Sequence, residues 1–417
     1  MAVSRKRYPL MESRMRKPLA TLLLMHTFVL SVNALNTAVS KDLVCRIITA
    51  NQYACERHLV RTADGYELML HRIPPKNTTI SQQYPPFILM HGLIGSAADF
   101  VLTGRKRSLG CILHEQGYDV WLPNARGNTY SKRHLHMDSS NSSFWNFSWH
   151  DIGYYDVPAV VDYVRETTVQ QQVHFVAHSQ GSTVFFVLLA ERPEYNEKFA
   201  SASLLAPVVF LANIRSPPFK IMTAKLEEIE VLLNHLGLYE LFPSTALNQL
   251  GGHLLCSQDA PTYNLCLLFT FLTVGFSDYQ MDRNLLPRIL ETTPAGISKN
   301  QFKHFGQLIR TGKFQKFDYQ SKDENLRQYK RQTPPEYNLR NVRVPLHLFV
   351  GTRDLLLTKE DAIRLTKELK NTKYTLHELR GFNHIDLLYS SMAPRLIYKQ
   401  ILNNVKNVTP VSVSRVL

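Results

Sequence analysis

A short turn between a buried strand and a helix limits what this chain can fold into more than any other feature. Residues 173–177 form a mostly apolar run typical of a buried strand, and residues 182–191 follow a helical pattern. Between them, AHSQG (177–181) matches G-x-S-x-G except at its first position. So sharp a turn strains the backbone at the serine and leaves little room two residues before and after it, a need that alanine and glycine meet. The motif predicts a nucleophile elbow that holds the Ser179 hydroxyl above a sheet.

A serine hydroxyl is a poor nucleophile until a neighbouring base takes its proton. Two later strand ends offer the missing partners, because Asp354 follows the strand pattern at 346–350 and His384 follows the one at 374–379. The chain order serine, aspartate, histidine is also that of enzymes which carry such an elbow. We expect Ser179 to be the nucleophile, His384 the base, and Asp354 the acid that holds the imidazole in the accepting tautomer.

Two neighbouring residues compete for parts of this set. Asp386 lies two residues beyond His384 and is the main rival to Asp354, but it does not follow a strand end. His178 adjoins the nucleophile, yet its side chain would point away from the Ser179 hydroxyl, so we expect a structural role for it.

Backbone N–H groups are the expected partners of the negative charge that develops when a serine attacks a carbonyl. The first N–H after the nucleophile belongs to Gln180, at the start of a helix, where negative charge is favoured. A second would come from Leu93, on a loop that follows the apolar strand pattern at 87–90. Glycines at positions 92 and 95 let this loop approach a substrate closely. We therefore expect Leu93 and Gln180 to form an oxyanion hole.

Strand and helix patterns alternate in the outer parts of the chain, whereas the part between them has little strand pattern. Alternation of this kind predicts the α/β class, with a mostly parallel sheet covered by helices on both faces. The middle part contains helical stretches and the apolar run 265–276. The expected organisation is a signal peptide at 1–34, a first core part at 35–210, a helical cap or lid at 211–335 and a second core part at 336–417.

The first 34 residues have the composition of a secretory signal. A basic stretch precedes the apolar run 19–30, and small residues follow it. An uncleaved anchor is the alternative, but the run is shorter than the roughly 20 apolar residues that span a bilayer. Four Asn-X-Ser/Thr sequons agree with passage through the secretory pathway, and we expect glycosylation at Asn77, Asn141, Asn146 and Asn407. The expected location is secreted or lysosomal.

The five cysteines and the net charge restrict the remaining options. In an oxidising compartment we expect Cys256 to pair with Cys266 and Cys45 with Cys55, which leaves Cys111 free; five buried thiols are the alternative. No cysteine or histidine spacing suggests a metal, and we expect neither metal nor cofactor. The net charge of +14 comes from scattered bases without a nucleic-acid-binding motif, so we expect no nucleic-acid partner.

Six motifs, in order along the chain, make this sequence similar to the acid lipase family, which contains gastric lipase and lysosomal acid lipase and has insect members. The motifs are HGLIGS (91–96), YDVWLPNARGNTYS (118–131), FWNFSWHDIGYYDVPA (144–159), AHSQG (177–181), GKFQKFDY (312–319) and GFNHIDLLY (381–389). The resemblance covers most of the chain from Cys45 onward. Ala177, Pro123 and Ala125 depart from the family pattern, and none of these departures removes a catalytic group.

The resemblance implies an α/β-hydrolase core with a helical cap, and hydrolysis of acyl esters in neutral lipids through an acyl-enzyme. It implies triacylglycerol or cholesteryl ester as substrate, met at a membrane or emulsion surface. It also implies a cap disulfide, for which Cys256 and Cys266 are in the expected place. The apolar run 265–276 could then line an acyl pocket, or form the plain core of the cap.

Two other readings stay open. One is a catalytically silent lipid-binding or yolk-type protein on the same fold, because a fold does not fix a function. The other is a different α/β-hydrolase chemistry, such as epoxide opening, but that chemistry needs a carboxylate at the elbow. The presence of Ser179 with both partners favours an esterase over either reading.

Overall fold

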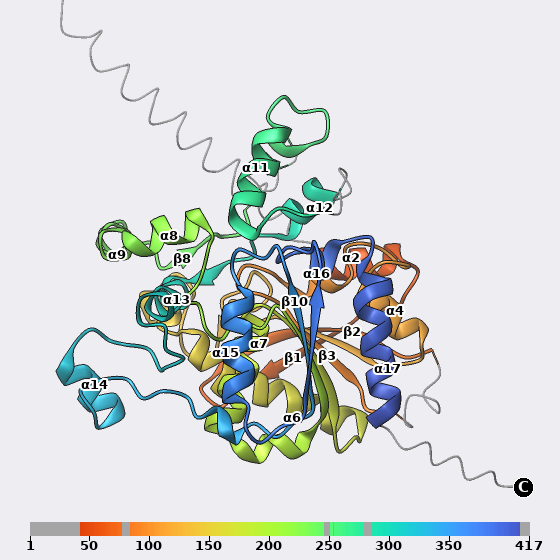
Figure 1. The fold of residues 1–417 in the computed structure, drawn as a ribbon, viewed down its shortest axis with the longest axis horizontal. Helices are drawn as coiled ribbons and strands as arrows, with labels where there is room; N and C mark the ends of the chain where they lie inside the picture. Colours follow the sequence, from red (N-terminus) through yellow and green to blue (C-terminus); the bar gives the residue numbers. More distant parts are fainter. Residues whose placement is uncertain (1–41, 77–83, 246–250, 253, 279–284, 409–417) are drawn as a thin grey trace, which may run out of the picture.

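The computed structural model describes residues 42–76, 84–245, 251–252, 254–278 and 285–408, with side chains as far as residue 405. Its centre is a nine-stranded sheet in the order β1-β2-β4-β3-β6-β7-β10-β11, with β5 paired to β2 (Figure 1). The strands are β1 (Glu56–Arg61), β2 (Tyr66–Ile73), β3 (Phe87–Met90), β4 (Val120–Pro123), β5 (Arg133–His134), β6 (Val173–His178), β7 (Phe199–Leu205), β10 (Leu346–Gly351) and β11 (Tyr374–Leu379). Pairs involving β2 are antiparallel, and the pairs from β4 onward are parallel.

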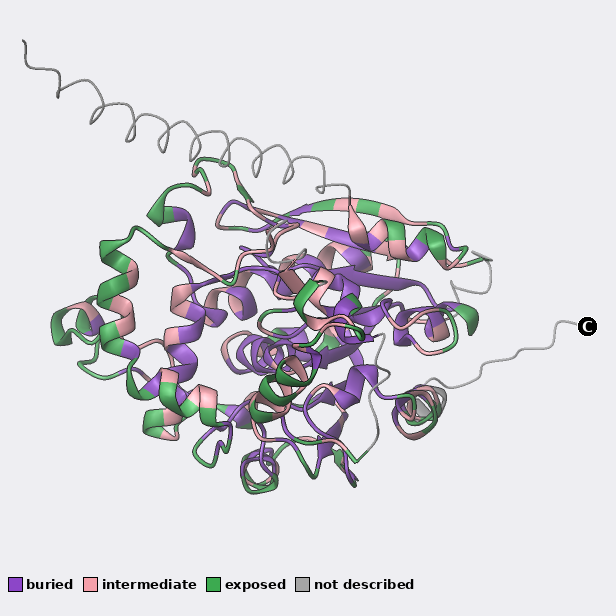
Figure 2. Ribbon diagram, turned by 90° about the horizontal axis from the view of Figure 1, so that it is seen from above, coloured by how far each residue is buried: buried purple, intermediate pink, exposed green. Residues whose placement is uncertain are grey.

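Helices cover both faces of this sheet, as alternating strand and helix patterns predict. In Figure 1, α7 (Gln180–Glu191) and α15 (Lys359–Glu368) lie on one side, and α4 (Leu109–Glu115) and α17 (Lys399–Val408) on the other. The strands β3 and β6 are buried along their whole length, which explains the unbroken apolar run of β3 and the mostly apolar run of β6. Buried residues gather around the sheet, and exposed ones lie mostly on the outer helices (Figure 2). The prediction of an α/β fold with a mostly parallel sheet is confirmed.

The segment between β7 and β10 lies mostly over the carboxyl ends of the parallel strands, apart from its last helix, which lies beside the core (Figure 1). It is mainly helical, with one two-stranded sheet of β8 (Glu240–Leu241) and β9 (Ile297–Ser298). The helices are α8 (Pro217–Ala224), α9 (Leu226–His235), α11 (Tyr263–Val274), α12 (Leu285–Thr292), α13 (Lys299–Thr311) and α14 (Lys322–Tyr329). Within the described residues, no helix has the length and apolar character needed to cross a bilayer.

The helix that precedes β6 belongs to a longer helical run. A turn of α-helix, α5 (Trp149–Asp151), and a π-helical turn, Ile152–Asp156, lead directly into α6 (Val157–Thr168). Asp156, the residue before α6, makes no side-chain capping bond and instead accepts hydrogen bonds from Arg126. Ser148 is the residue that caps this run, in a capping box with Asp151.

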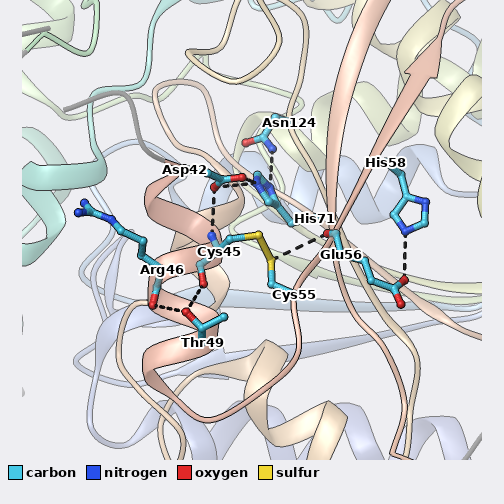
Figure 3. Close-up of a disulfide and its surroundings, with 9 residues drawn as sticks. All are labelled: Asp42, Cys45, Arg46, Thr49, Cys55, Glu56, His58, His71 and Asn124. Carbon is cyan, nitrogen blue, oxygen red and sulfur yellow. Dashed lines mark hydrogen bonds and ion pairs between the residues drawn. A yellow bond between two sulfur atoms is a disulfide. The ribbon is translucent and has the colours of Figure 1, made fainter. Parts of the chain in front are cut away.

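Both disulfides expected from the sequence are present, and Cys111 is a buried free thiol. The Cys45–Cys55 bond holds the first turn of α2 (Leu43–Ala50) to the residue just before the strand β1 (Figure 3). Next to it, Asp42 accepts a hydrogen bond from the N–H of Cys45 and lies 3.0 Å from Nε2 of buried His71. Asp42, Cys45 and His71 are close enough to suggest a metal site, but the Cys45 sulfur is already bonded to Cys55, so this trio is structural.

Candidate active site

Ser179 lies at the point where β6 ends and α7 begins, with φ 54° and ψ −119°. This left-handed backbone costs a residue other than glycine about 1–3 kcal/mol, a strain typical of active sites. The N–H of Ser179 donates to the carbonyl of Leu205 at 2.9 Å, which holds the turn against β7. A methyl group on Gly181 would lie 2.5 Å from the carbonyl oxygen of Met90, so only glycine fits there. The local sequence thus produces the elbow that its motif predicts.

The structure brings Ser179, His384 and Asp354 together from three strand ends. Nε2 of His384 lies 2.9 Å from the Ser179 hydroxyl, and Nδ1 lies 2.7 Å from Oδ2 of Asp354. Since the carboxylate can only accept, Nδ1 carries the proton and Nε2 is free to accept one. The Asp354 side chain is fixed in turn, because its Oδ1 accepts the N–H groups of Leu356 and Leu357 at 2.8 and 2.9 Å. The geometry is that of a nucleophile, a base and an orienting acid.

The two rival residues have other partners. Asp386 is buried, and its Oδ2 accepts the N–H of Asn383 at 2.8 Å. Burial lowers the pKa of His178 to about 3, so its ring is neutral. Its Nε2–H donates to the carbonyl of His384 at 3.0 Å, which is a contact with the backbone of the base and not with the nucleophile.

The loop that carries Leu93 packs directly against the elbow. A methyl group on Gly92 would lie 3.3 Å from Cβ of Ser179. The buried ring of His91 accepts the N–H of Ala125 at 3.1 Å through Nε2, so its Nδ1–H donates to the carbonyl of Gly92 at 2.7 Å. Burial lowers the pKa of His91 to about 4, which keeps this neutral tautomer. The loop is therefore rigidly placed beside Ser179.

Gln180 is the first residue of α7, where helix amides have no intrahelical acceptor. The N–H of Gln180 lies in the elbow, and that of Leu93 lies in the loop after β3, which packs against the Ser179 side chain. Two further bonds fix that loop. The side-chain amide of Asn128 donates to the carbonyl of Gly95 at 3.0 Å, and the N–H of Ala295 donates to the carbonyl of Ile94 at 2.9 Å.

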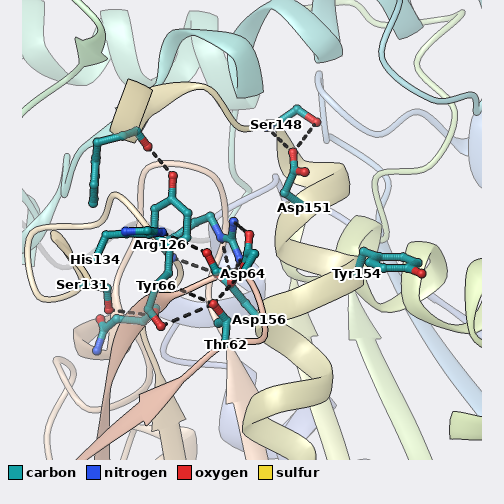
Figure 4. Close-up of polar contacts among 12 residues, drawn as sticks. Thr62, Asp64, Tyr66, Arg126, Ser131, His134, Ser148, Asp151, Tyr154 and Asp156 are labelled. Carbon is teal, nitrogen blue, oxygen red and sulfur yellow. Dashed lines mark hydrogen bonds and ion pairs between the residues drawn. The ribbon is translucent and has the colours of Figure 1, made fainter. Parts of the chain in front are cut away.

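A buried ion cluster anchors the loop after β4 that holds His91 and Gly95 in place. Arg126 is 1 % exposed and donates to Asp156 at 2.7 Å and to Asp64 at 2.6 and 2.9 Å (Figure 4). Its guanidinium lies 4.0 Å from the centre of the Tyr66 ring. Removing one partner of such a cluster leaves an uncompensated buried charge, which typically costs 3–5 kcal/mol. The sequence offered Arg126 only as part of a family motif, and nothing in it pairs this residue with Asp64.

Ser179 and His384 lie on the wall of an apolar cavity of about 180 Å³. Its lining comes from the sheet loops and from the segment between β7 and β10, and includes Leu93, Val208, Leu211, Phe219, Val274, Ile289, Phe305, Leu356 and Leu388. A larger open groove of about 700 Å³ between α8, α9 and α13 contains none of the three site residues. An apolar cavity beside a nucleophile suits the acyl chain of an ester.

The apolar run 265–276 could, from the sequence, either line an acyl pocket or form the core of the cap. In the structure it contributes little to this cavity. From it, Thr273 and Val274 line the cavity. Most of its large side chains face outward, with Leu265 and Phe269 each 65 % exposed and Phe276 51 % exposed. They are therefore neither the acyl pocket nor a packed core of the cap, and they form an exposed apolar face on α11.

Asp99 is a cavity residue that sequence reasoning missed. Its Oδ1 accepts the hydroxyl of Tyr389 at 3.1 Å, and a methyl group on Gly95 would lie 2.1 Å from its Oδ2. Burial raises the pKa of Asp99 to about 7, so the acid is largely neutral in mildly acidic solution. The cavity wall then carries little charge that would oppose an acyl chain. The only sequence signal was an acid inside the otherwise apolar turn AADF (97–100).

Two of the four sequons, Asn141 and Asn146, lie on exposed backbone turns, as a glycosylated side chain requires. Asn77, the side chain of Asn407 and the segment 1–34 lie outside the described residues.

Comparisons with known proteins agree with this site. A family model described as "Partial alpha/beta-hydrolase lipase region" matches residues 44–104, and one described as "alpha/beta hydrolase fold" matches residues 85–390. The chain is 41 % identical to Lipase 3 of Drosophila melanogaster, over 85 % of this chain and 90 % of that one. It is 34 % identical to gastric triacylglycerol lipase of Bos taurus, over 86 % and 90 %. A bacterial membrane phospholipase A shares the fold, with a TM-score of 0.51 at 17 % identity, over 94 % of this chain and all of that one. The chain therefore belongs to the acid lipase family of α/β-hydrolases, together with gastric triacylglycerol lipase.

Proposed function

We propose that the protein is a serine lipase that hydrolyses the acyl ester bonds of neutral lipids, triacylglycerol or cholesteryl ester. Ser179 is the nucleophile, His384 the general base and Asp354 the residue that orients it. The observation that carries this proposal is the continuous hydrogen-bonded chain from the Ser179 hydroxyl through the His384 ring to Asp354, at the wall of an apolar cavity. An intact set of this kind argues against a silent lipid-binding protein.

The reaction follows from the positions of these groups. Ser179 attacks the ester carbonyl while His384 takes its proton through Nε2, and Asp354 stabilises the imidazolium that forms. The N–H groups of Leu93 and Gln180 hold the negative oxygen of the tetrahedral intermediate. His384 then gives its proton to the leaving alcohol, which leaves an acyl-enzyme on Ser179. Water, deprotonated by the same ring, releases the fatty acid and restores the serine.

A fluorophosphonate probe tests this assignment, because it reacts with an activated serine and not with an ordinary one. We expect one equivalent of label per folded chain, located on Ser179 by peptide mass spectrometry. Labelling of another serine, or none in protein that is folded by circular dichroism and hydrolyses esters, would contradict the assignment.

The exposed apolar face of α11 supports the proposal that the substrate is met at a lipid surface. Leu265 and Phe269 are one helical turn apart, and Leu268 and Leu272 form a second exposed pair beside them. Exposed apolar patches of this kind mark protein or membrane contact sites. Part of the cap, residues 211–335, would act as a lid that opens there, and activity should rise as a soluble ester passes into emulsion.

Replacing Leu265 and Phe269 together by aspartate should lower activity on emulsified triacylglycerol by about tenfold or more, because burying one such side chain contributes roughly 1.5–3 kcal/mol. Hydrolysis of a short-chain ester below its solubility limit should be unchanged. Leu326→Asp is the matched control, since Leu326 is 48 % exposed on α14, away from α11. Equal losses on both substrates would contradict a surface role.

We also propose that residues 1–34 direct the chain into the secretory pathway and that it acts in the extracellular space or the lysosome. The two disulfides and the exposed sequons at Asn141 and Asn146 support this location.

A further inference from the structure

The segment formed by the last residue of α11 and the four residues after it, 274–278, crosses the loop that carries His384. It is called the strap below. Four of its five residues contact that loop, residues 381–386, or the neighbouring loop after β10 that carries Asp354. The contacts involve Val274, Gly275, Ser277 and Asp278.

Val274, the first residue of the strap, contacts both His384 and the loop that carries Asp354. The carbonyl of Val274 accepts the N–H of His384 at 3.2 Å and that of Leu355, the residue after Asp354, at 3.4 Å. The carbonyl of His384 is held from the opposite side by Nε2–H of His178 at 3.0 Å. The N–H and the carbonyl of His384 are therefore both hydrogen-bonded, the first to the strap and the second to His178 in the elbow.

Gly275 is the tightest point of the strap. Its φ is +110°, and a methyl group on it would lie 1.9 Å from the carbonyl oxygen of Arg353. Its own carbonyl accepts the side-chain amide of buried Asn383 at 2.8 Å. The other end of that amide accepts the N–H of Ile385 at 3.1 Å and the N–H of Asp386 at 2.9 Å. Asn383 therefore links the strap to the turn that aims the His384 ring.

The last two residues of the strap, Ser277 and Asp278, also contact these loops. Ser277 makes a side-chain hydrogen bond to Asp386. The N–H of Asp278 donates to the carbonyl of Gly381 at 3.0 Å, and its carboxylate lies 3.2 Å from the guanidinium of Arg353. The strap therefore contacts the loop that carries His384 along its whole length, from Gly381 to Asp386.

We propose that Gly275 and Asn383 are positioning residues for the His384–Asp354 pair, and that the strap holds this pair in place from the end of α11. The inference rests on the proposed lipase function. The same helix exposes Leu265 and Phe269, and its last turn supplies Thr273 and Val274 to the cavity wall. The hydrogen bonds of the strap therefore help to hold Nε2 of His384 at 2.9 Å from the Ser179 hydroxyl.

Gly275→Ala tests the proposal, because the added methyl group must push the strap off the carbonyl of Arg353. We expect kcat on a soluble short-chain ester to fall by about 100-fold, the size of effect that a displacement near 1 Å produces. KM should stay within about threefold, since the cavity itself is retained. Gly251→Ala is the matched control, because none of the described residues beyond its chain neighbours lies within 4 Å of a methyl group there. All rates are divided by the number of sites that a fluorophosphonate labels at completion.

Asn383→Asp is the second variant, since it keeps the acceptor for Ile385 and Asp386 but loses the donor to Gly275. It should show the same split, a lower kcat with little change in KM. A wild-type kcat per labelled site in both variants, or a change in KM alone, would overturn the proposal even if the variants unfold more easily. Failure of the proposed function is a separate outcome, because the wild-type protein would then hydrolyse no ester in the same assay.

Discussion

Ser179→Ala should lower ester hydrolysis by about 10⁵-fold or more, because the enzyme loses the atom that attacks the carbonyl and the remaining groups cannot replace it. The folded structure should persist. The hydroxyl makes one hydrogen bond, to His384, and alanine meets the same backbone strain at φ 54° as serine does. Turnover of a soluble ester and circular dichroism of the purified variant measure the two effects.

Ser182→Ala is the matched control for this variant. Ser182 lies in the first turn of α7, is fully buried, and its hydroxyl has no hydrogen-bond partner among the described residues. We expect its activity to stay within about twofold of the wild type, because no partner is lost. A Ser179→Ala enzyme that keeps a tenth of the wild-type rate would be incompatible with nucleophilic catalysis by this residue.

The sequence predicted the parts of the site that depend on local pattern. The elbow at Ser179 needs a buried strand, a small residue on either side and a helix, and all of these can be read along the chain. Asp354 and His384 could be placed because each follows a strand, and parallel strands end at one edge of a sheet. Chain order then assigned the acid and the base.

The parts that the sequence did not predict depend on contacts between distant segments. Arg126 meets Asp64 across 62 positions, and Asn383 meets Gly275 across 108. No periodicity connects such residues. The exposed face of α11 was also misjudged, because an apolar run at helical spacing looks the same whether it is packed inside a protein or left exposed on its surface.

Asp354→Asn should lower kcat by about 10⁴-fold while leaving the loop after β10 intact. Oδ1 of Asp354 accepts the N–H groups of Leu356 and Leu357, so the amide oxygen of asparagine must take that place. The amide nitrogen then faces Nδ1 of His384, where the carboxylate oxygen was at 2.7 Å. Because both groups cannot donate, Nδ1 has to accept and the ring proton moves to Nε2.

This tautomer places an N–H against the Ser179 hydroxyl in place of the lone pair that should take its proton. The loss therefore comes from a proton on the wrong nitrogen, with little change in substrate binding, and should appear in kcat and not in KM. Asp386→Asn tests the rival acid. Asp386 accepts the N–H of Asn383 and a hydrogen bond from Ser277 of the strap, so we expect a loss of about 10- to 100-fold, the usual size of a lost supporting contact and well below 10⁴-fold. If Asp386→Asn caused the larger loss, the acid of the catalytic set would have to be reassigned to Asp386.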